Sequence, residues 1–262
     1  MEMPLQMKWI KKAASALYFL WAGFWFIFFM FLIFPLVVTG SFFGKIKGGN
    51  FVYKLLHAWG DFWFFMVGMN VKRIMEEEPD TKKQYVFVVN HISNLDAALL
   101  VKVIRQPFRP LGKIELKNVP VFGFIYKVCV VVVDRSSAEN RQQSIRHLKF
   151  VIRKGVSILI FPEGTFNETG RPMKECFDGA FRLAVETQTP IKPVIFPDNY
   201  SRFHYRSLLS LNPGKCRAVF LPMVPVDGLT MADVPRLKQQ VVSLMETKLR
   251  EYNAEWIRED PH

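Results

Sequence analysis

The feature that most constrains this chain is a long uncharged apolar stretch near its N-terminus. Between Lys12 and Lys45 lie 32 residues, 13–44, none of which carries a formal charge. A helix needs about 20 apolar residues to cross the hydrocarbon core of a bilayer, so this stretch is long enough. Three tryptophans lie near its basic end, where amphipathic rings favour the headgroup level: Trp9, Trp21 and Trp25. We therefore expect a membrane helix here.

A cleaved secretory signal is the main alternative for this stretch, because such signals also begin basic and continue apolar. Their apolar core is only about 7–15 residues long and ends in a small-residue cleavage site, which residues 35–39 do not offer. Three lysines precede the stretch and three follow it, so flanking charge does not orient it: Lys8, Lys11, Lys12, Lys45, Lys47 and Lys54. A crossing helix and a helix that re-enters the same face both stay open.

A second helical pattern follows a hinge predicted at residues 44–50. Apolar side chains recur every three or four positions and form one stripe: Phe51, Leu55, Trp59, Phe62, Met66 and Met69. Lys54, His57 and Asp61 recur at the same steps on another face. This helix either lies in the membrane interface or packs on the rest of the chain, since the pattern alone does not choose. We assign residues 1–70 to a membrane-associated helical pair.

Residues 71–262 have the pattern of one α/β domain. Short β-branched apolar runs predict strands buried on both faces: 85–89, 128–133, 156–161, 191–196 and 218–222. Helical patterns alternate with these runs or follow them: 95–104, 139–154, 179–187 and 235–256. The alternation predicts a largely parallel or mixed sheet flanked by helices. The three cysteines form no CxxC pair, which argues against a disulfide scaffold and the common zinc sites.

The first chemical motif, NHISNLD at residues 90–96, follows the strand predicted at 85–89. Ligands of open α/β sheets bind beyond the carboxyl ends of strands. Across a strand–turn–helix junction the Asp96 carboxylate can fold back onto the His91 imidazole, fix its tautomer and leave the outer nitrogen to accept a proton. Ser93-x-x-Asp96 is also a capping-box pattern, which would make Asp96 a residue that only starts a helix. Both interpretations stay open.

The second motif, LIFPEGT at residues 159–165, again places a tight turn at the end of a strand. Pro162 ends the strand, Gly164 permits the turn, and Glu163 lies at the strand end. A Pro-Glu-Gly turn is also a common surface feature. The motif gains weight from His91, because two strand ends could bring both residues to one cleft.

Together these segments resemble the glycerolipid acyltransferase superfamily, and within it the 1-acyl-sn-glycerol-3-phosphate acyltransferases. The family's NHxxxxD block corresponds to residues 90–96 and its FPEGT block to 161–165. Further similar blocks lie between and after these two: Lys113-x-Glu115-Leu116, Pro120-x-Phe122-Gly123, Val133-Asp134-Arg135 and Pro190-Ile191-x-Pro193-Val194. The resemblance covers roughly residues 87–194, and ordered blocks are far more specific than either short motif.

The resemblance implies that His91 is the general base and that Asp96 orients it. His91 would take the proton from a glycerol hydroxyl, which attacks the thioester carbonyl of acyl-CoA or acyl-acyl carrier protein. It also implies the residues that bind the acceptor: Glu163, Gly164, Thr165, Arg135 and Lys113. Arg135 would meet the acceptor's phosphate, because a guanidinium offers a charged fork. No cofactor, metal or covalent acyl-enzyme is expected.

Three positions depart from the family's pattern. Phe166 replaces the Arg usual after FPEGT, Cys129 replaces a Gly of the middle block, and Phe177 replaces a Lys before the Gly-Ala-Phe turn. Losing basic side chains at the headgroup end leaves the acceptor's identity open. Either Arg171 or Lys174 replaces them, or the acceptor is a different lysolipid.

We therefore expect a membrane-bound O-acyltransferase that acylates the sn-2 hydroxyl of 1-acyl-sn-glycerol-3-phosphate and yields phosphatidic acid. We expect its catalytic domain at the cytoplasmic face. The alternatives are acylation of another lysolipid, such as a lysophospholipid or lyso-aminolipid, and a non-enzymatic basic membrane-surface protein that uses the net charge of +12. We expect no nucleic-acid partner, because the predicted strands show no stacking-aromatic signature. Donor carrier, acyl chain length and oligomeric state stay open.

Overall fold

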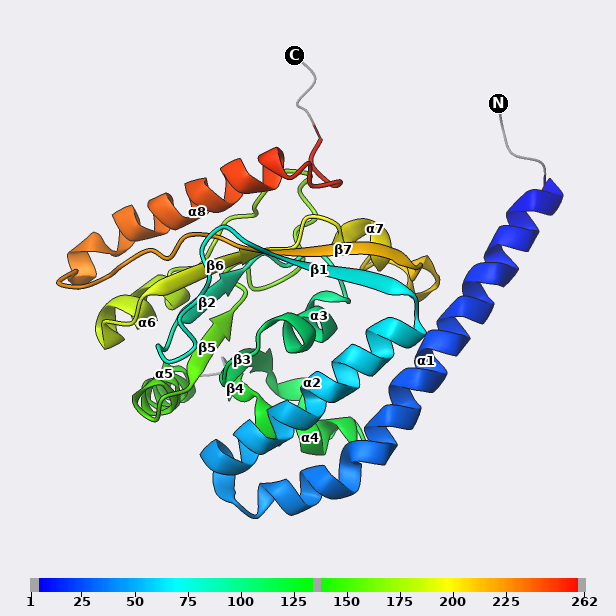
Figure 1. Ribbon diagram of the computed structural model, residues 1–262. Coiled ribbons are helices and arrows are strands. Elements are labelled where there is room, and N and C mark those ends of the chain that lie inside the picture. The colour runs from blue at the N-terminus through cyan, green and yellow to red at the C-terminus, as the bar shows by residue number, and fades with distance from the viewer. Residues whose placement is uncertain (1–4, 134–137, 259–262) are drawn as a thin grey trace.

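The computed structural model describes residues 5–133 and 138–258 and is built around one seven-stranded sheet (Figure 1). The strands are β1 (Met69–Met75), β2 (Val86–Val89), β3 (Phe108–Lys113), β4 (Val131–Val133), β5 (Ser157–Ile160), β6 (Ile191–Ile195) and β7 (Gly214–Phe220). Their order is β1-β7-β6-β2-β5-β3-β4, and only β6 and β7 pair antiparallel. The predicted largely parallel or mixed sheet is confirmed.

Helices cover both faces of this sheet. They are α1 (Leu5–Ser41), α2 (Gly49–Met66), α3 (Asp96–Val103), α4 (Phe122–Cys129), α5 (Ala138–Arg153), α6 (Gly179–Thr187), α7 (Asn199–Arg202) and α8 (Val234–Glu251). Side chains of β2 alternate between the two faces, as pleating requires. Val86 and Val88 pack with α5, α6 and α8, whereas Phe87 and Val89 pack with α2, α3 and α4.

The first two helices form an antiparallel hairpin that lies beside the sheet (Figure 1). Trp63 Nε1 of α2 donates to the carbonyl of Ala22 in α1 at 2.9 Å, so the two helices are joined by hydrogen bonds as well as by apolar contact. A π-helical turn, η1 (Gly44–Gly48), connects them. A Cβ atom at Gly48 would collide with the carbonyl of Gly40, and one at Gly49 with the Arg109 guanidinium. The two glycines of the predicted hinge therefore permit close packing.

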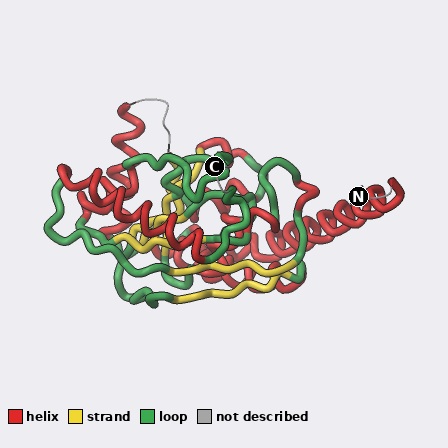
Figure 2. Tube along the Cα trace, turned by 90° about the horizontal axis from the view of Figure 1, so that it is seen from above, coloured by secondary structure: helices red, strands yellow, loops and turns green. Residues whose placement is uncertain are grey.

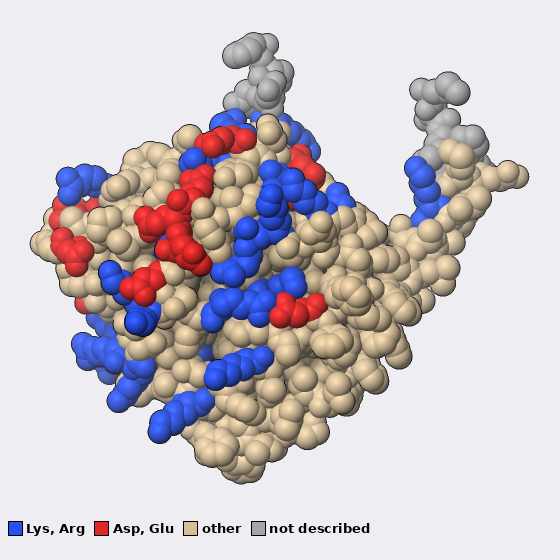
Figure 3. All heavy atoms as spheres, viewed as in Figure 1, with Lys and Arg blue, Asp and Glu red and all other residues tan. Residues whose placement is uncertain are grey.

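Helix α1 has the length and apolarity needed to cross a bilayer, and no other described helix does. The candidate span is Trp9–Ser41. Figure 2 shows this helix extending from one side of the body, and Figure 3 shows a surface almost free of charged side chains below its N-terminal end. Large apolar side chains are exposed along it, among them Leu20, Phe24, Phe28, Phe31 and Leu36.

Helix α2 does not bury the stripe that its sequence predicts. Trp59 is buried, but Phe51 and Phe62 of that stripe are exposed. The buried residues instead include Val52, Tyr53, Leu56, Trp63 and Phe64. The predicted polar face packs on α3, where Asp61 accepts from Lys102 at 2.9 Å and from Arg105 at 2.6 Å. Helix α2 thus packs on the α/β domain while it leaves part of its apolar surface uncovered.

The predicted element bounds differ from the observed ones at several places. Strands β1 and β3 and helix α4 were not predicted, and the strand expected over 128–133 begins inside α4. The helix expected to run to residue 256 ends at Glu251. The boundary drawn between residues 70 and 71 falls within β1, and the hairpin shares an apolar core with the sheet.

Candidate active site

His91 and Asp96 lie beyond the carboxyl end of β2, where the chain enters α3. His91 Nδ1 lies 2.8 Å from Asp96 Oδ2. The same oxygen accepts the backbone N–H groups of Ile92 at 2.8 Å and Ser93 at 2.9 Å. Because the carboxylate accepts the proton on Nδ1, the His91 tautomer has Nε2 free to accept another proton.

The capping-box interpretation of Asp96 holds only in part. The Ser93 N–H donates to Asp96 Oδ2 at 2.9 Å, but Ser93 Oγ accepts from the N–H of Leu95 at 3.0 Å and does not cap Asp96. Asp96 is the first residue of α3, and its backbone N–H donates to the carbonyl of Ser93 at 3.2 Å. Its side chain is fully buried. Its carboxylate accepts hydrogen bonds from the loop that carries His91 and from the side chain of Asn199. A residue that starts the helix therefore also orients the imidazole.

Asn199 is a site residue that no sequence motif predicted. It begins α7, just beyond the carboxyl end of β6, and its Nδ2 donates to Asp96 Oδ1 at 2.8 Å. Both oxygens of the carboxylate are thus occupied by fixed donors. The one available signal was a polar Asp198-Asn199 pair directly after a predicted strand, at the same edge of the sheet as His91.

Glu163 joins the two motifs through backbone contacts. It lies in the turn after β5, where Gly164 has a φ of +71° and donates its N–H to the carbonyl of Phe161 at 3.1 Å. Glu163 Oε1 accepts the backbone N–H of His91 at 2.8 Å, and Oε2 accepts that of Lys174 at 2.9 Å. Burial raises the pKa of Glu163 to about 7, against the opposing effect of these two hydrogen bonds.

Five of the seven predicted site residues therefore fall into one connected segment of structure. His91, Asp96 and Glu163 are linked by hydrogen bonds, and Gly164 and Thr165 complete the turn. Thr165 Oγ1 lies 2.6 Å from the ammonium of Lys174. Arg135 and the side chain of Lys113 lie outside the described part of the chain.

Aromatic rings cover the His91 imidazole. Phe161 stacks on it with ring centroids 4.1 Å apart and an interplanar angle of 19°, and Phe166 contacts it at 4.4 Å. Phe166 in turn stacks on Tyr205 at 5.4 Å. The His91 side chain is 22% exposed, so the rings leave part of the imidazole open to a ligand. At the position where the family that the motifs resemble usually has Arg, this chain places an apolar ring beside the His91 imidazole.

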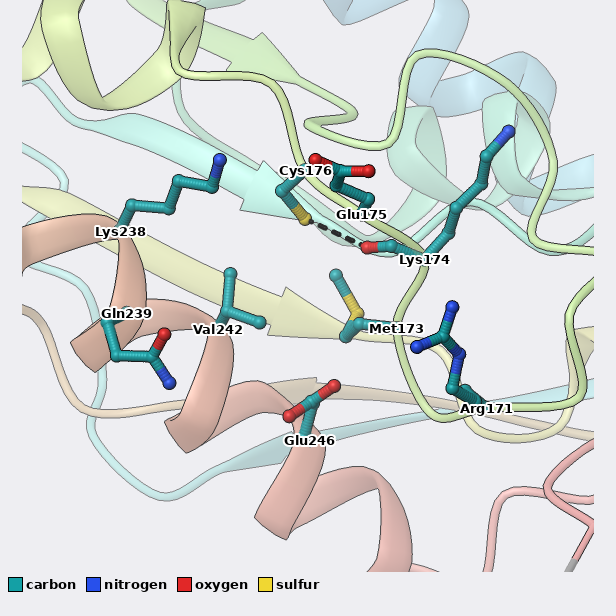
Figure 4. Close-up of a pocket in the computed structure, with 9 residues that line it drawn as sticks. All are labelled: Arg171, Met173, Lys174, Glu175, Cys176, Lys238, Gln239, Val242 and Glu246. Carbon is teal, nitrogen blue, oxygen red and sulfur yellow. Dashed lines mark hydrogen bonds between the residues drawn. The ribbon is translucent and has the colours of Figure 1, made fainter. Parts of the chain in front are cut away.

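A cavity of about 310 Å³ lies between the loop after Thr165 and helix α8 (Figure 4). Arg171, Lys174 and Glu175 line it from the loop, and Lys238 and Glu246 line it from α8. In Figure 4 the side chain of Lys174 points away from the cavity. None of the motif residues His91, Asp96 and Glu163 lines it. His91 and Glu163 thus lie close together, as expected, because the His91 backbone N–H donates to Glu163. They do not face each other across this cavity.

No group of three His, Cys, Asp or Glu side chains that could hold a metal ion occurs in residues 5–133 and 138–258. The described site offers an imidazole held by a carboxylate, together with backbone and hydroxyl groups around it.

Known proteins resemble this chain over the segment that carries these motifs. Residues 70–197 match the Acyltransferase family. The 1-acyl-sn-glycerol-3-phosphate acyltransferase alpha of Homo sapiens is 33% identical over 175 residues, which cover 65% of this chain and 60% of that protein. The protein of the same name from Mus musculus is 31% identical over 206 residues, covering 77% and 69%. The matched part therefore spans about 60% of the length of the human relative.

The fold is shared with a solved structure. It is the 1-acyl-sn-glycerophosphate (LPA) acyltransferase of Thermotoga maritima, which superposes with a TM-score of 0.73 at 21% sequence identity. The match covers 95% of this chain and all of that one. The N-terminal helical hairpin is thus included in the matched architecture.

Proposed function

This chain belongs to the 1-acyl-sn-glycerol-3-phosphate acyltransferase family, and from that premise we propose that it is a membrane-bound O-acyltransferase. It transfers an acyl group from a thioester to the sn-2 hydroxyl of 1-acyl-sn-glycerol-3-phosphate and yields phosphatidic acid. The observation that supports this proposal most is the His91–Asp96 pair, with Nδ1 held at 2.8 Å by a buried carboxylate and Nε2 left free.

In the proposed mechanism His91 acts as a general base. Its Nε2 removes the proton of the glycerol hydroxyl while the oxygen attacks the thioester carbonyl. The C–S bond then breaks, and the leaving thiolate takes the proton back from the imidazolium. Asp96 stabilises the imidazolium between these steps, and positioned bases of this kind typically contribute about 10²–10⁴ in rate. Because the hydroxyl attacks directly, no acyl-enzyme forms.

The residues proposed to bind the acceptor act in different ways. Glu163 is fully buried and both its oxygens accept backbone N–H groups, so we propose that it fixes the His91 loop and the Lys174 loop relative to each other. Thr165 and the backbone of Gly164 are proposed to face the headgroup. We keep Arg135 and Lys113 as the groups proposed to bind its phosphate, on the sequence blocks alone.

The acyl donor is proposed to be acyl-CoA or acyl-acyl carrier protein, which reach the site from the cytoplasm. This places the catalytic domain at the cytoplasmic face of the membrane, with the apolar surface of α1 in the lipid. Protease added to sealed inverted vesicles should then cleave the α/β domain, whereas protease added to intact cells should not.

A different lysolipid acceptor is the second candidate, and Phe166 is the observation that favours it. The ring stands beside His91 where the family usually has a cation, so Phe166 itself offers no charge to a phosphate monoester.

The two candidates are separated by assaying the purified full chain in detergent micelles. Lysophosphatidic acid, lysophosphatidylcholine, lysophosphatidylethanolamine and a lyso-aminolipid are each supplied with the same acyl chain on CoA and on acyl carrier protein. Formation of phosphatidic acid at the highest kcat/KM supports the main proposal. Preferred acylation of another lysolipid would replace it with the second candidate. Absence of transfer to every acceptor from both donors would contradict an enzymatic role.

A further inference from the structure

A second and larger cavity, of about 570 Å³, lies at the β4 edge of the sheet. Strand β4 is separated from β2 by β5 and β3, which places this edge roughly 14 Å across the sheet from the strand that carries His91. The cavity is enclosed by η1, the end of α4, β4 and helix α5. The cavity therefore lies away from His91, although Ile114 of its lining directly follows Lys113.

The described side chains that line this cavity include four nitrogen bases or cations and no carboxylate: Lys45, Arg109, Lys127 and His147. Lys45 and Lys127 are exposed, and neither forms an ion pair with a described residue. Burial and the nearby Lys45 ammonium lower the pKa of His147. Lys45, Lys127 and Arg109 create a positive potential that no described carboxylate at the cavity neutralises.

Arg109 is the deepest of these charges. It is only 3% exposed, and its guanidinium donates to the backbone carbonyls of Phe108, Lys45 and Ile46 and to the side chain of Asn50. All of these acceptors are neutral. A buried cation that is hydrogen-bonded but not neutralised favours an anion in the adjoining space.

Apart from Gln143 and Ser144 of α5, the rest of the cavity wall is apolar, and it adjoins the exposed surface of the hairpin. Its inner wall consists mainly of the valines at 128 and 130–132. Just before η1, Phe42 is 84% exposed and Phe43 is 66% exposed. On α4, the exposed Phe124 precedes Lys127 by one helical turn and contacts Phe34 of α1 at 5.7 Å. The basic rim thus lies where the apolar surface ends, at the level expected for lipid headgroups.

We propose that this cavity binds the phosphate-bearing headgroup of an anionic phospholipid from the surrounding bilayer. Lys45, Lys127 and His147 lie at the rim, where they contact the phosphate, and Arg109 adds its charge from below. The acyl chains leave along Phe124 and the exposed face of α1. Charge complementarity selects an anionic lipid over a zwitterionic one, whose headgroup brings a cation into the same positive field.

Native mass spectrometry of the full chain in detergent micelles tests this binding in the absence of either substrate. Phosphatidylglycerol and phosphatidylcholine with identical acyl chains are added at equal concentration. Wild type should retain one phosphatidylglycerol in preference to phosphatidylcholine. The double variant Lys45→Gln/Lys127→Gln should retain it about 25-fold less, which is about fivefold for each lysine near a headgroup phosphate.

The matched control is Lys72→Gln/Lys215→Gln, which removes the same charge from exposed positions of β1 and β7 at the far side of the sheet. It should bind as wild type does, and both double variants should keep their thermal unfolding temperature. The proposal would be overturned if both double variants lost phosphatidylglycerol binding equally, or if Lys45→Gln/Lys127→Gln lost none. Displacement of the lipid by an equal concentration of coenzyme A or inorganic phosphate would also overturn it, because the cavity would then bind soluble phosphates.

Discussion

Asp96 organises the site at the scale of single residues. Its Oδ2 accepts from the imidazole and from two backbone N–H groups, and its Oδ1 accepts from Asn199. Three of these donors belong to residues 91–93, so the carboxylate orients the imidazole and shapes the loop that carries it.

Replacing Asp96 by Asn should lower kcat by about 100-fold or more, because the amide cannot accept every hydrogen bond that fixes the tautomer of His91. KM for the lysolipid should change little. Asn199→Ala is the graded comparison. It removes one donor to the carboxylate but keeps the His91 contact, and should lower kcat by about tenfold. Equal activity of Asp96→Asn and wild type would show that the pair does not hold the base.

Glu163 should make folding stability depend on pH. Its pKa is raised from 4.5 to about 7 in the folded chain, so the folded state binds this proton more tightly than the unfolded chain does. Stability from this group is present at low pH and is lost as pH rises from 4.5 to about 7, by on the order of 3 kcal/mol.

Glu163→Gln should remove that dependence, because an amide does not titrate. Unfolding measured across this pH range should show wild type losing stability relative to the variant as pH rises. Glu168→Gln, at an exposed position of the same loop, should follow wild type. If the free energy of unfolding changed with pH in the same way for Glu163→Gln and wild type, the raised pKa of Glu163 would not be the source of the pH dependence.

At this scale the sequence supported His91, Asp96 and the FPEGT turn, because each follows a buried strand within one short motif. Asn199 escaped prediction because its contact with Asp96 joins residues 103 positions apart. The hydrogen bond from the His91 backbone N–H to Glu163 was not predicted for the same reason. It joins residues far apart in the sequence, and no local pattern shows which backbone group a carboxylate will contact.

At the scale of elements, the sequence predicted the central strands and the edge strand β4, whereas the two strands that it missed are the edge strand β1 and its counterpart one strand in from the other edge, β3. Strands β2, β5 and β6 are buried on both faces and are mainly apolar, with Ser157 in β5 and Lys192 in β6 as the exceptions. The edge strand β1 contains Lys72 and Arg73, as exposed edge strands often do, and its apolar pattern is weak. Strand β3 contains Arg, Pro and Gly, which sequence propensity assigns to loops. Tertiary pairing, and not local preference, forms both of these strands.

The hairpin depends on a clamp between elements. Arg109 of β3 donates to Lys45 and Ile46 of η1 and to Asn50 of α2, and thereby ties the N-terminal hairpin to the sheet. This contact also accounts for Gly49, whose missing side chain leaves room for the guanidinium.

Arg109→Ala should loosen η1 and lower the free energy of unfolding by about 2–4 kcal/mol, because buried carbonyls lose their donor. Limited trypsin digestion reports the loosening directly, since Lys45 and Lys47 lie within η1. Cleavage there should accelerate in the variant. Arg105→Ala, which removes only a half-exposed ion pair with Asp61, should digest like wild type. Equal digestion of Arg109→Ala and wild type would show that the clamp does not hold η1.

At the scale of the whole molecule, the apolar surface and the candidate site belong to one body. The hairpin packs on the same face of the sheet as α3, whose first turn carries Asp96. The sequence predicted the N-terminal hairpin and the α/β domain but not the apolar core that they share. The reason is that the face of α2 that packs on the domain is not its most regular apolar stripe.

The central claim is that the free nitrogen of His91 removes the proton of the acceptor hydroxyl. Its most direct test compares His91→Ala with wild type, both as full chains in vesicles, by the initial rate of phosphatidic acid formation from lysophosphatidic acid and an acyl thioester. The account predicts a loss of at least about 100-fold in kcat with unchanged folding and lysolipid binding. Transfer by His91→Ala at a rate close to that of wild type would contradict it.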